Sequence, residues 1–566
     1  MIRRSQSIKL KHFRGDGSQA IELIESHLAL SRIRIISNDY KSLDEFWSRS
    51  YTRFKQRMFF KQLNVSPLRR DMLNMKKLLL ASLLTISTMP VHSQSFDDTD
   101  DILVRASQIE NLEYKMMVQR ATQTAIHYMP AVTQIDFLKA TRRDLNGDYN
   151  DVVYVNEPFG SEKGFLTAND TTAYAWATTT SKNGPVVIEV PAATDKVNYF
   201  GSVVNQWEVP ITDVGFKGAD EGEGGKYLFL PPGYNNEFGS KQALESQGYL
   251  VFETDTYLYG FSFRPSLTNG ATDLDAGNYA KKIKIYNLVD AENPPKTDYL
   301  DATEVAYDSL PYYNETFFQD INDVIQENPV RAQDKAMASL LKDLGIEKGK
   351  KFDPTDEQKK AIREGVLMAY AHMQSKFVEP EQTVSALWKD ENGKPLSQWS
   401  FWNFGPQAQL GFPFVDEDEV LVDKRAASYF YVTYLPKQLG GSTFYLTGLR
   451  DSKGEMLDGK ATYKLNVPAD TPVEDFWSAI VYNMETKNFV KGVDRVGLSS
   501  RNADSMKKNL DGSYDLYFGP EAPKGQEENW VPTGGEDYFL LFRLYRPTSK
   551  TFFKNWMLED MEKISG

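Results

Sequence analysis

The segment from Asn509 to Pro547 constrains the fold of this 566-residue chain more than any other. Polar and apolar side chains alternate over residues 514–518, which is the period of a half-buried strand. The run from Tyr538 to Tyr545 is apolar except for Arg543, as is typical of a core strand. A loop with Asn529-Trp530-Val531-Pro532 lies between them. The segment therefore predicts part of a β-rich domain, and it indicates no chemistry by itself.

Similar short apolar runs, separated by Gly, Pro and Asn, occupy two other parts of the chain. Short strands with regular turn residues favour β-sandwiches. We therefore expect one sandwich within 144–284 and a second after Trp399. The expected strands are 152–155, 174–177, 185–190, 199–204, 226–230 and 250–254, and then 429–432, 443–446, 461–467 and 476–482.

Two regions carry the spacing of helices instead. Residues 97–140 predict a helix that runs to Met129-Pro130, followed by a second short helix near Phe137. Residues 286–380 predict several helices, and Thr355 with Gln358 forms a capping box before the last of them. A chain of this length exceeds one ordinary domain. The patterns together predict an α+β, multidomain protein.

Residues 75–93 have the pattern of a bacterial secretory signal peptide: Met75-Lys76-Lys77, a short apolar run, and Val91-His92-Ser93 before a cut near Gln94. The apolar run is shorter than the roughly 20 residues that span a membrane. We therefore expect translation to start at Met75, with 1–74 as a mis-assigned extension. The alternative is a buried helix in a cytosolic protein. A periplasmic or secreted location is predicted, with no integral membrane segment after cleavage.

Composition excludes several function classes. Residues 94–566 carry 48 Lys and Arg against 71 Asp and Glu, a net charge of −23, which disfavours binding to nucleic acid or to anionic membranes. The chain has no Cys, so disulfides, thiolate nucleophiles and Cys-based zinc sites are absent. Only His127 and His372 follow the signal segment, and each suits packing or a surface better than catalysis. No nucleotide-binding loop or hydrolase elbow is present.

Several motifs resemble a bacterial pair of domain-of-unknown-function families, numbered 1254 and 1214. The first is similar at 167–174, 184–191 and 224–234, although Ala168 stands where that family usually has Pro. The second is similar at residues 476–482, 509–513, 528–532 and 542–547, with Trp556 near the end.

The resemblance implies an immunoglobulin-like β-sandwich, a helical middle domain and a jelly-roll-like C-terminal β-sandwich. It implies no agreed activity. The expected domains are 94–285 (family 1254), 286–385 (helical) and 386–566 (family 1214), after the extension 1–74 and the signal segment 75–93.

One loop has the oxygen donors of a Ca²⁺ site. Asp144, Asn146 and Asp148 stand at alternate positions, but the Gly and Glu of a Ca²⁺-binding EF-hand loop are missing, so an ordinary turn competes with a metal site. No cofactor is expected unless this loop binds Ca²⁺.

The candidate site residues fall in two places. Asn169 and Asp170 precede an aromatic run that includes Tyr174: Asp170 could act as a general base, or the pair could simply form a turn. Arg543 could bind an anion, beside Tyr545, or could be a structural partner of Asp515, Tyr545 or Trp530. Trp530 could stack on a sugar or anchor its loop.

Two functions stay open at this point. The first is a ligand-binding or structural envelope protein, whose partner would be an unknown small molecule or carbohydrate. The second is a hydrolase or lyase that acts on a carbohydrate or other small molecule in a cleft between the sandwiches, using carboxylates such as Asp170, with Arg543 and Tyr545. Sequence alone leaves catalysis and the oligomeric state undecided.

Overall fold

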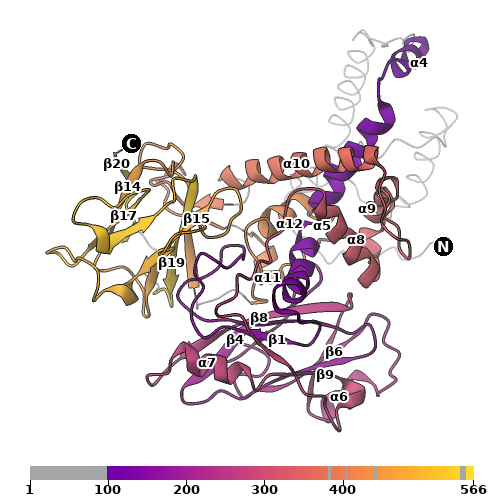
Figure 1. Cartoon of the computed structure of the whole chain (residues 1–566), viewed down its shortest axis with the longest axis horizontal. Coiled ribbons are helices and arrows are strands. Elements are labelled where there is room, and N and C mark those ends of the chain that lie inside the picture. The colour runs from indigo at the N-terminus through magenta and orange to yellow at the C-terminus, as the bar shows by residue number, and fades with distance from the viewer. Residues whose placement is uncertain (1–98, 380–383, 403, 439–442, 549–555, 566) are drawn as a thin grey trace, which may run out of the picture. The chain divides into compact units, whose positions relative to one another are not determined.

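The computed structural model describes residues 99–379, 384–402, 404–438, 443–548 and 556–565. The chain divides into two units, 1–107 and 108–566. Within the first unit, the described part is helix α4 (Thr99–Ser107). The predicted extension and signal peptide lie outside the described residues. The other described helices and strands belong to the second unit (Figure 1).

A long helix, α5 (Leu112–Leu145), is the centre of a helical layer. It packs against α10, and Figure 1 shows the two helices beside one another. Further helices pack around it: α8 (Thr316–Glu327), α9 (Lys335–Leu340), α10 (Asp356–Val378) and α12 (Val422–Tyr429). The capping box predicted at Thr355 and Gln358 is present at the start of α10.

The prediction that the first helix ends near Pro130 was wrong, since α5 continues through it. Proline inside a helix removes one backbone hydrogen bond and costs about 3 kcal/mol. Here the flanking turns are almost wholly buried, from Ala125 to Leu138. Tertiary packing of that length stabilises the helix by more than the proline costs.

The first β-rich region contains two sheets. A six-stranded sheet has the order β10-β1-β2-β8-β4-β5, and a four-stranded sheet has the order β7-β6-β3-β9. Apolar side chains of both sheets form one shared core, so the two sheets pack face to face. The strands are β1 (Val152–Tyr154), β2 (Ala175–Thr180), β3 (Val186–Val190), β4 (Val197–Asn205), β5 (Pro210–Val214), β6 (Gly225–Leu230), β7 (Tyr249–Glu253), β8 (Leu258–Leu267), β9 (Lys284–Asn287) and β10 (Tyr299–Asp301). Two short helices, α6 (Lys241–Ser246) and α7 (Asp273–Ala280), join them.

The second β-rich region repeats this plan. A six-stranded sheet has the order β11-β12-β13-β19-β15-β16, and a four-stranded sheet has the order β18-β17-β14-β20. A second shared core joins the two sheets. The strands are β11 (Val384–Ala386), β12 (Trp399–Trp402), β13 (Thr443–Gly448), β14 (Thr462–Val467), β15 (Trp477–Asn483), β16 (Gly497–Ser499), β17 (Tyr514–Gly519), β18 (Trp530–Pro532), β19 (Tyr538–Tyr545) and β20 (Glu562–Ser565). The short helix α11 (Gln407–Leu410) follows β12.

Strand β19 is buried on both faces. Leu540, Phe542 and Leu544 belong to the core between the sheets, whereas Phe539 and Leu541 belong to the core that contains the helical layer. This explains why the run 538–545 is apolar except for Arg543. By the two-residue period, Arg543 lies on the face directed away from the sandwich core.

The α+β, multidomain class predicted from the sequence is confirmed by these sheets and helices. One predicted strand was wrong: Tyr429 ends helix α12, Phe430 and Tyr431 follow it as a turn, and Val432 lies in irregular structure. The apolar residues of this segment are buried because they pack on the helical layer. An apolar run buried in this way has the same sequence pattern as a buried strand, so periodicity does not distinguish the two. Within the described ranges, no helix is long and apolar enough to cross a bilayer.

Candidate functional site

The outer face of the first six-stranded sheet carries polar side chains on β8. Phe261 and Phe263 point into the sandwich core, so the alternating residues Ser262 and Arg264 lie on the opposite face. Arg264 is paired across the ladder with Phe200 of β4. A cation therefore stands on the outer face of this sheet, next to an aromatic ring.

The corresponding face of the second six-stranded sheet also carries a cation. Arg543 of β19 is paired with Tyr445 of β13 on one side and with Ser478 of β15 on the other. Its guanidinium carbon lies 4.8 Å from the ring centre of Tyr445. Only 2% of Arg543 is exposed. The β-ladder thus fixes a guanidinium and a phenol side by side.

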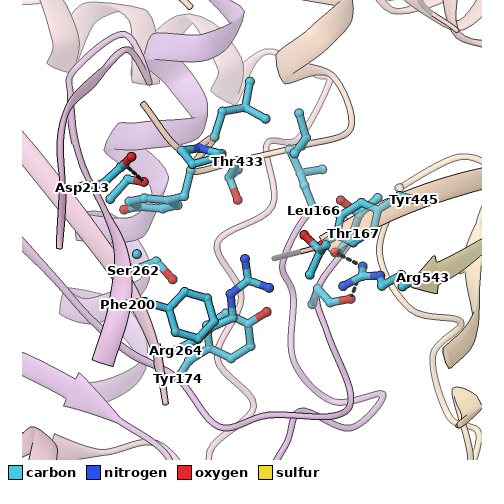
Figure 2. A pocket seen from close by; sticks show the side chains of 18 of the residues that line it. Leu166, Thr167, Tyr174, Phe200, Asp213, Ser262, Arg264, Thr433, Tyr445 and Arg543 are labelled. Carbon is cyan, nitrogen blue, oxygen red and sulfur yellow. Dashed lines mark hydrogen bonds between the residues drawn. The ribbon is translucent and has the colours of Figure 1, made fainter. Parts of the chain in front are cut away.

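A cavity of about 290 Å³ lies between these two faces. Figure 2 shows Arg264 and Arg543 on it, one from each sandwich. Aromatic and aliphatic side chains form most of the remaining wall, including Phe159, Phe165, Tyr174, Phe200, Trp402 and Tyr434. Apolar walls with a few convergent polar groups are typical of small-molecule sites.

The charged side chains on this cavity are unequal in sign. In the described part of the chain they are three cations, Lys217, Arg264 and Arg543, and one carboxylate, Asp213. Asp213 accepts hydrogen bonds from Ser202 Oγ (2.8 Å) and from the backbone N–H groups of Lys437 (2.8 Å) and Gln438 (3.0 Å). Its oxygens are therefore engaged with the wall rather than with either arginine.

Arg543 holds the loop that leads to Asp170. One of its terminal nitrogens donates to the carbonyls of Thr167 (2.7 Å) and Ala168 (2.9 Å), and to the hydroxyl of Tyr482. Its Nε is buried without a hydrogen-bond partner. Carbonyls and phenols satisfy some of the donors of this buried guanidinium, but no carboxylate among the described residues forms an ion pair with it.

The structural partners expected for Arg543 were wrong. Asp515 instead accepts a hydrogen bond from Asn466, on the four-stranded sheet. The rings beside the guanidinium are those of Tyr445 and Tyr482, not those of Tyr545 and Trp530. The error arose because β19 neighbours β13 and β15 in its sheet, which the sequence does not reveal.

Arg264 is less constrained than Arg543. Its guanidinium carbon lies 5.9 Å from the ring centre of Tyr174 and 5.6 Å from that of Phe200, and it donates a hydrogen bond to Tyr445. Among the described residues, no carboxylate lies within ion-pair distance of Arg264 or of Arg543. The cavity therefore contains two guanidinium groups that contact the same phenol.

The phenol of Tyr445 is acidified by its neighbours. Burial raises its pKa, but the positive charges of Arg264 and Arg543 lower it by more, so that the pKa of Tyr445 falls to about 8. The hydroxyl is therefore mostly protonated near neutral pH and ionises just above it.

The structure places Asn169, Asp170 and Tyr545 close to Arg543. Tyr545 donates to Asn169 Oδ1 at 3.0 Å, and Arg543 binds the loop two residues before Asp170. Asp170 itself lines a second cavity of about 420 Å³, with Glu157, Glu162 and Glu304. Burial raises the pKa of the Asp170 carboxyl to about 6, although Arg543 acts in the opposite direction.

The other sequence candidates are located elsewhere. Trp530 lies in β18, donates to Gly519 O at 3.0 Å, and does not line the arginine cavity. Asp144 pairs with Arg143 at 2.7 Å, and Asp148 pairs with Arg142 at 2.5 Å. Among the described residues, no group of three or more His, Asp or Glu is placed to hold a metal ion. The Ca²⁺ prediction stays a prediction.

Sequence reasoning missed Arg264 and Tyr445. The signal for Arg264 was available, since 258–267 alternates aromatic with small or polar residues and Arg264 follows Phe263. Tyr445 carried no signal, because a tyrosine in an aromatic strand is commonly part of a core. Only the pairing of β13 with β19 places it beside Arg543.

A buried carboxyl lies behind the cavity wall. Glu208 is fully buried, and its Oε2 accepts the backbone N–H of Tyr434 at 3.0 Å. The amide nitrogen of Gln134, oriented toward it, donates to Oε1 at 2.9 Å. Burial raises the pKa of Glu208 to about 8, against the effect of the Tyr434 N–H.

A second buried cationic centre lies in the helical layer, around Trp207. Arg331 binds Asp334 at 2.6 Å and Asp255 at 3.0 Å. Asp334 also accepts from His127 Nε2 at 3.0 Å, and Arg425 donates to the carbonyl of His127 at 3.0 Å. Both guanidinium carbons lie within 5 Å of the Trp207 ring centre, at 4.3 and 4.8 Å.

Comparison with known proteins agrees with the motifs. Residues 149–287 match the family model described as protein of unknown function DUF1254, and residues 442–549 match the one described as protein of unknown function DUF1214. The pairing predicted from the sequence, with 1254 before 1214, is confirmed. A search of curated proteins finds no match.

Two solved structures resemble the chain. The VPA0106 protein from Vibrio parahaemolyticus is 18% identical, with a TM-score of 0.46, over 79% of this chain and 100% of that one. An uncharacterized protein from Burkholderia cenocepacia is 9% identical, with a TM-score of 0.34, over 80% of this chain and 96% of that one. Neither name gives an activity.

Proposed function

We propose that the protein is exported and binds a small molecule in the cavity between its two sandwiches. The observation that carries this proposal is the convergence of Arg264 and Arg543 on one apolar cavity. Cations at an apolar wall destabilise an empty protein unless something compensates them. The presence of both arginines on this wall therefore favours a role in ligand recognition over a role in packing.

The proposal is tested by thermal-shift screening of the purified protein against small organic molecules, sugars and Ca²⁺. A bound ligand raises the midpoint of unfolding, and the increase grows with the logarithm of its concentration relative to its Kd. Stabilisation that disappears in a Phe200→Ala variant assigns the ligand to the cavity. Stabilisation that persists in the Phe200→Ala variant would contradict the proposal, and so would a panel in which no compound stabilises the protein.

Export rests on the pattern of residues 75–93. The test is the N-terminus of the protein recovered from bacterial periplasmic extract. We expect it near Gln94, whereas a protein that retains Met1 and stays in the cytoplasm would contradict export. The same recovered protein is the natural material for the ligand screen.

We also propose the finer fold classes, an immunoglobulin-like first sandwich and a jelly-roll-like second one. Support comes from two packed, mostly antiparallel sheets in each region. Three parallel pairs, β1 with β10, β6 with β7 and β17 with β18, depart from a purely antiparallel plan. An experimental structure with traced strand connections would decide both classes.

A second candidate function, hydrolysis or elimination, is favoured by the position of Asp170. It shares its own cavity with three glutamates and has a pKa of about 6, which suits a general acid or base. We expect any turnover of model glycosides or uronides to be abolished in Asp170→Asn. Full activity in that variant would exclude Asp170 from catalysis.

A further inference from the structure

We propose that the ligand of the arginine cavity is a small organic anion, a carboxylate or phosphate on an aromatic or apolar body, and that Arg264 is its principal contact. This inference rests on the proposed binding function and specifies its chemistry. Three observations carry it: the charge on the lining residues, the orphaned donor of Arg543, and the freedom of Arg264.

The charges on the cavity wall are not balanced by its carboxylate. The lining holds two guanidinium groups and one carboxylate, and that carboxylate, Asp213, accepts three hydrogen bonds from the cavity wall. Asp170 belongs to a different cavity and hydrogen-bonds neither arginine. An anion between the guanidinium groups would therefore neutralise a charge that the described residues leave in place.

The two arginines also have hydrogen-bond donors without acceptors. Arg543 is almost fully buried, yet its Nε has no partner. Most buried polar atoms in proteins are hydrogen-bonded, so such an orphan needs an explanation. Among the described residues, Arg264 contacts the rings of Tyr174 and Phe200 and the phenol of Tyr445, and no carboxylate or carbonyl accepts its remaining N–H groups. An oxyanion offers several lone pairs to both groups at once.

The walls specify the rest of the ligand. Tyr174 and Phe200 lie against Arg264, and Trp402 stands 5.5 Å from Tyr445, ring centre to ring centre. These surfaces favour a flat or apolar body over a freely hydrated ion such as inorganic phosphate. A cavity of about 290 Å³ limits that body to a small molecule.

The test uses matched pairs of probes that differ in charge but not in shape: benzoate with benzamide, phenylacetate with phenylacetamide, and phenyl phosphate with phenol. Titration calorimetry on the full chain measures each affinity. We expect at least one anion to bind about tenfold or more tightly than its neutral partner, as hydrogen bonds to charged groups predict. The carboxylate and phosphate arms identify the oxyanion.

The protein variants are Arg264→Gln and, as a control, Arg363→Gln on the exposed surface of α10, where Arg363 pairs with Glu315. Arg264→Gln should weaken the anion about tenfold to a hundredfold and leave its neutral partner unchanged. Arg363→Gln should change neither. Arg543 is left intact because it holds the 167–168 loop.

The outcomes separate this inference from the function beneath it. Equal binding of the anionic and neutral partners, or an unchanged affinity in Arg264→Gln, overturns the anion inference and leaves a binding cavity. Failure of every probe in all three pairs, together with no hit in the wider screen, overturns both. Equal loss in Arg363→Gln points to non-specific electrostatics and also overturns the inference.

Discussion

The molecule buries two pairs of arginines and treats them differently. Around Trp207, Arg331 pairs with Asp334 and Asp255, and Arg425 donates to His127, which in turn contacts Asp334. In the cavity, Arg264 and Arg543 meet phenols, rings and carbonyls. The first arrangement is a closed ion network that ties helices together. The second leaves charge available to a molecule that enters.

The carboxyl groups near the two centres follow the same division. Burial would raise the pKa of Asp334, but His127 and Arg331 hold it below its ordinary value. Burial also lowers the pKa of His127, so its ring is neutral, with Nε2–H facing Asp334 and Nδ1 facing Arg425. Glu208, near the cavity, has no such cation and its pKa is raised.

The largest effect is expected from opening the closed network. Asp334→Asn removes the negative charge shared by His127 and Arg331 and should lower the free energy of unfolding by about 3–5 kcal/mol. The midpoint of denaturant unfolding, followed by tryptophan fluorescence, measures it. Asp423→Asn is the control, because that carboxylate pairs with His372 at the surface and should change stability by about 1 kcal/mol or less. Similar losses in both variants would remove the distinction.

A smaller, pH-dependent effect is expected at Glu208. The pKa of Glu208 in the folded protein, about 8, lies above its ordinary value of 4.5. The stabilisation that its protonated carboxyl gives the folded protein is therefore fully present below about pH 4.5 and is lost as the pH rises through 8. Glu208→Gln should therefore be more stable than the parent by about 2–4 kcal/mol at pH 8 and nearly equal at pH 5. Denaturant unfolding at the two pH values tests this. A constant difference between the proteins would contradict it.

The cavity arginine should behave in the opposite way to the network. Arg264→Met removes a charge that no carboxylate compensates, so the free energy of unfolding should stay the same or rise by about 1 kcal/mol. Arg425→Met, in the network, should lower it by about 2 kcal/mol because His127 loses its donor. Thermal unfolding of both variants in parallel measures the contrast. A clear loss in Arg264→Met would mean that this residue is structural.

The smallest effect concerns the pH profile of binding. Below pH 8 the Tyr445 hydroxyl is protonated and can donate to an anion, and above it the phenolate competes with that anion for Arg264 and Arg543. The phenols of Tyr174 and Tyr545 also face these groups, and their pKa values are raised by burial, so they stay protonated longer. Affinity for the best anionic probe should fall about three- to tenfold between pH 7 and 9. Tyr445→Phe should flatten that fall, and an unchanged profile would contradict this role.

The sequence allowed much of the fold to be predicted and little of the site. Runs such as 186–190 and 226–230 are strands because short apolar segments between turns have few other solutions. Residues 429–432 have the same apolar pattern, but the strand predicted there was wrong, because residues buried under helices are also apolar. The helix end predicted at Pro130 was wrong for the opposite reason. Proline does destabilise a helix locally, but the tertiary packing of α5 stabilises this helix by more.

The site was harder because it depends on which strands are neighbours. Arg543 stood out as a charge in an apolar run, and the sequence identified it on that ground. The contacts predicted for Arg543 were wrong, because β19 pairs with β13 and β15, and both of these strands are distant from β19 along the chain. Arg264 becomes a second half of the same site only when the outer faces of two sheets are known to meet.

The burial of α5 also has a kinetic consequence. This helix comes early in the chain, yet the core that covers it includes Phe539 and Leu541 of β19, near the end. Contacts between such distant segments form late and slow the overall folding rate. During synthesis, α5 leaves the ribosome long before the strands that cover it have been made. The apolar faces of α5 therefore need protection from aggregation until those strands are available. The natural order of synthesis thus makes a holding chaperone more valuable to this chain than to one built from local contacts.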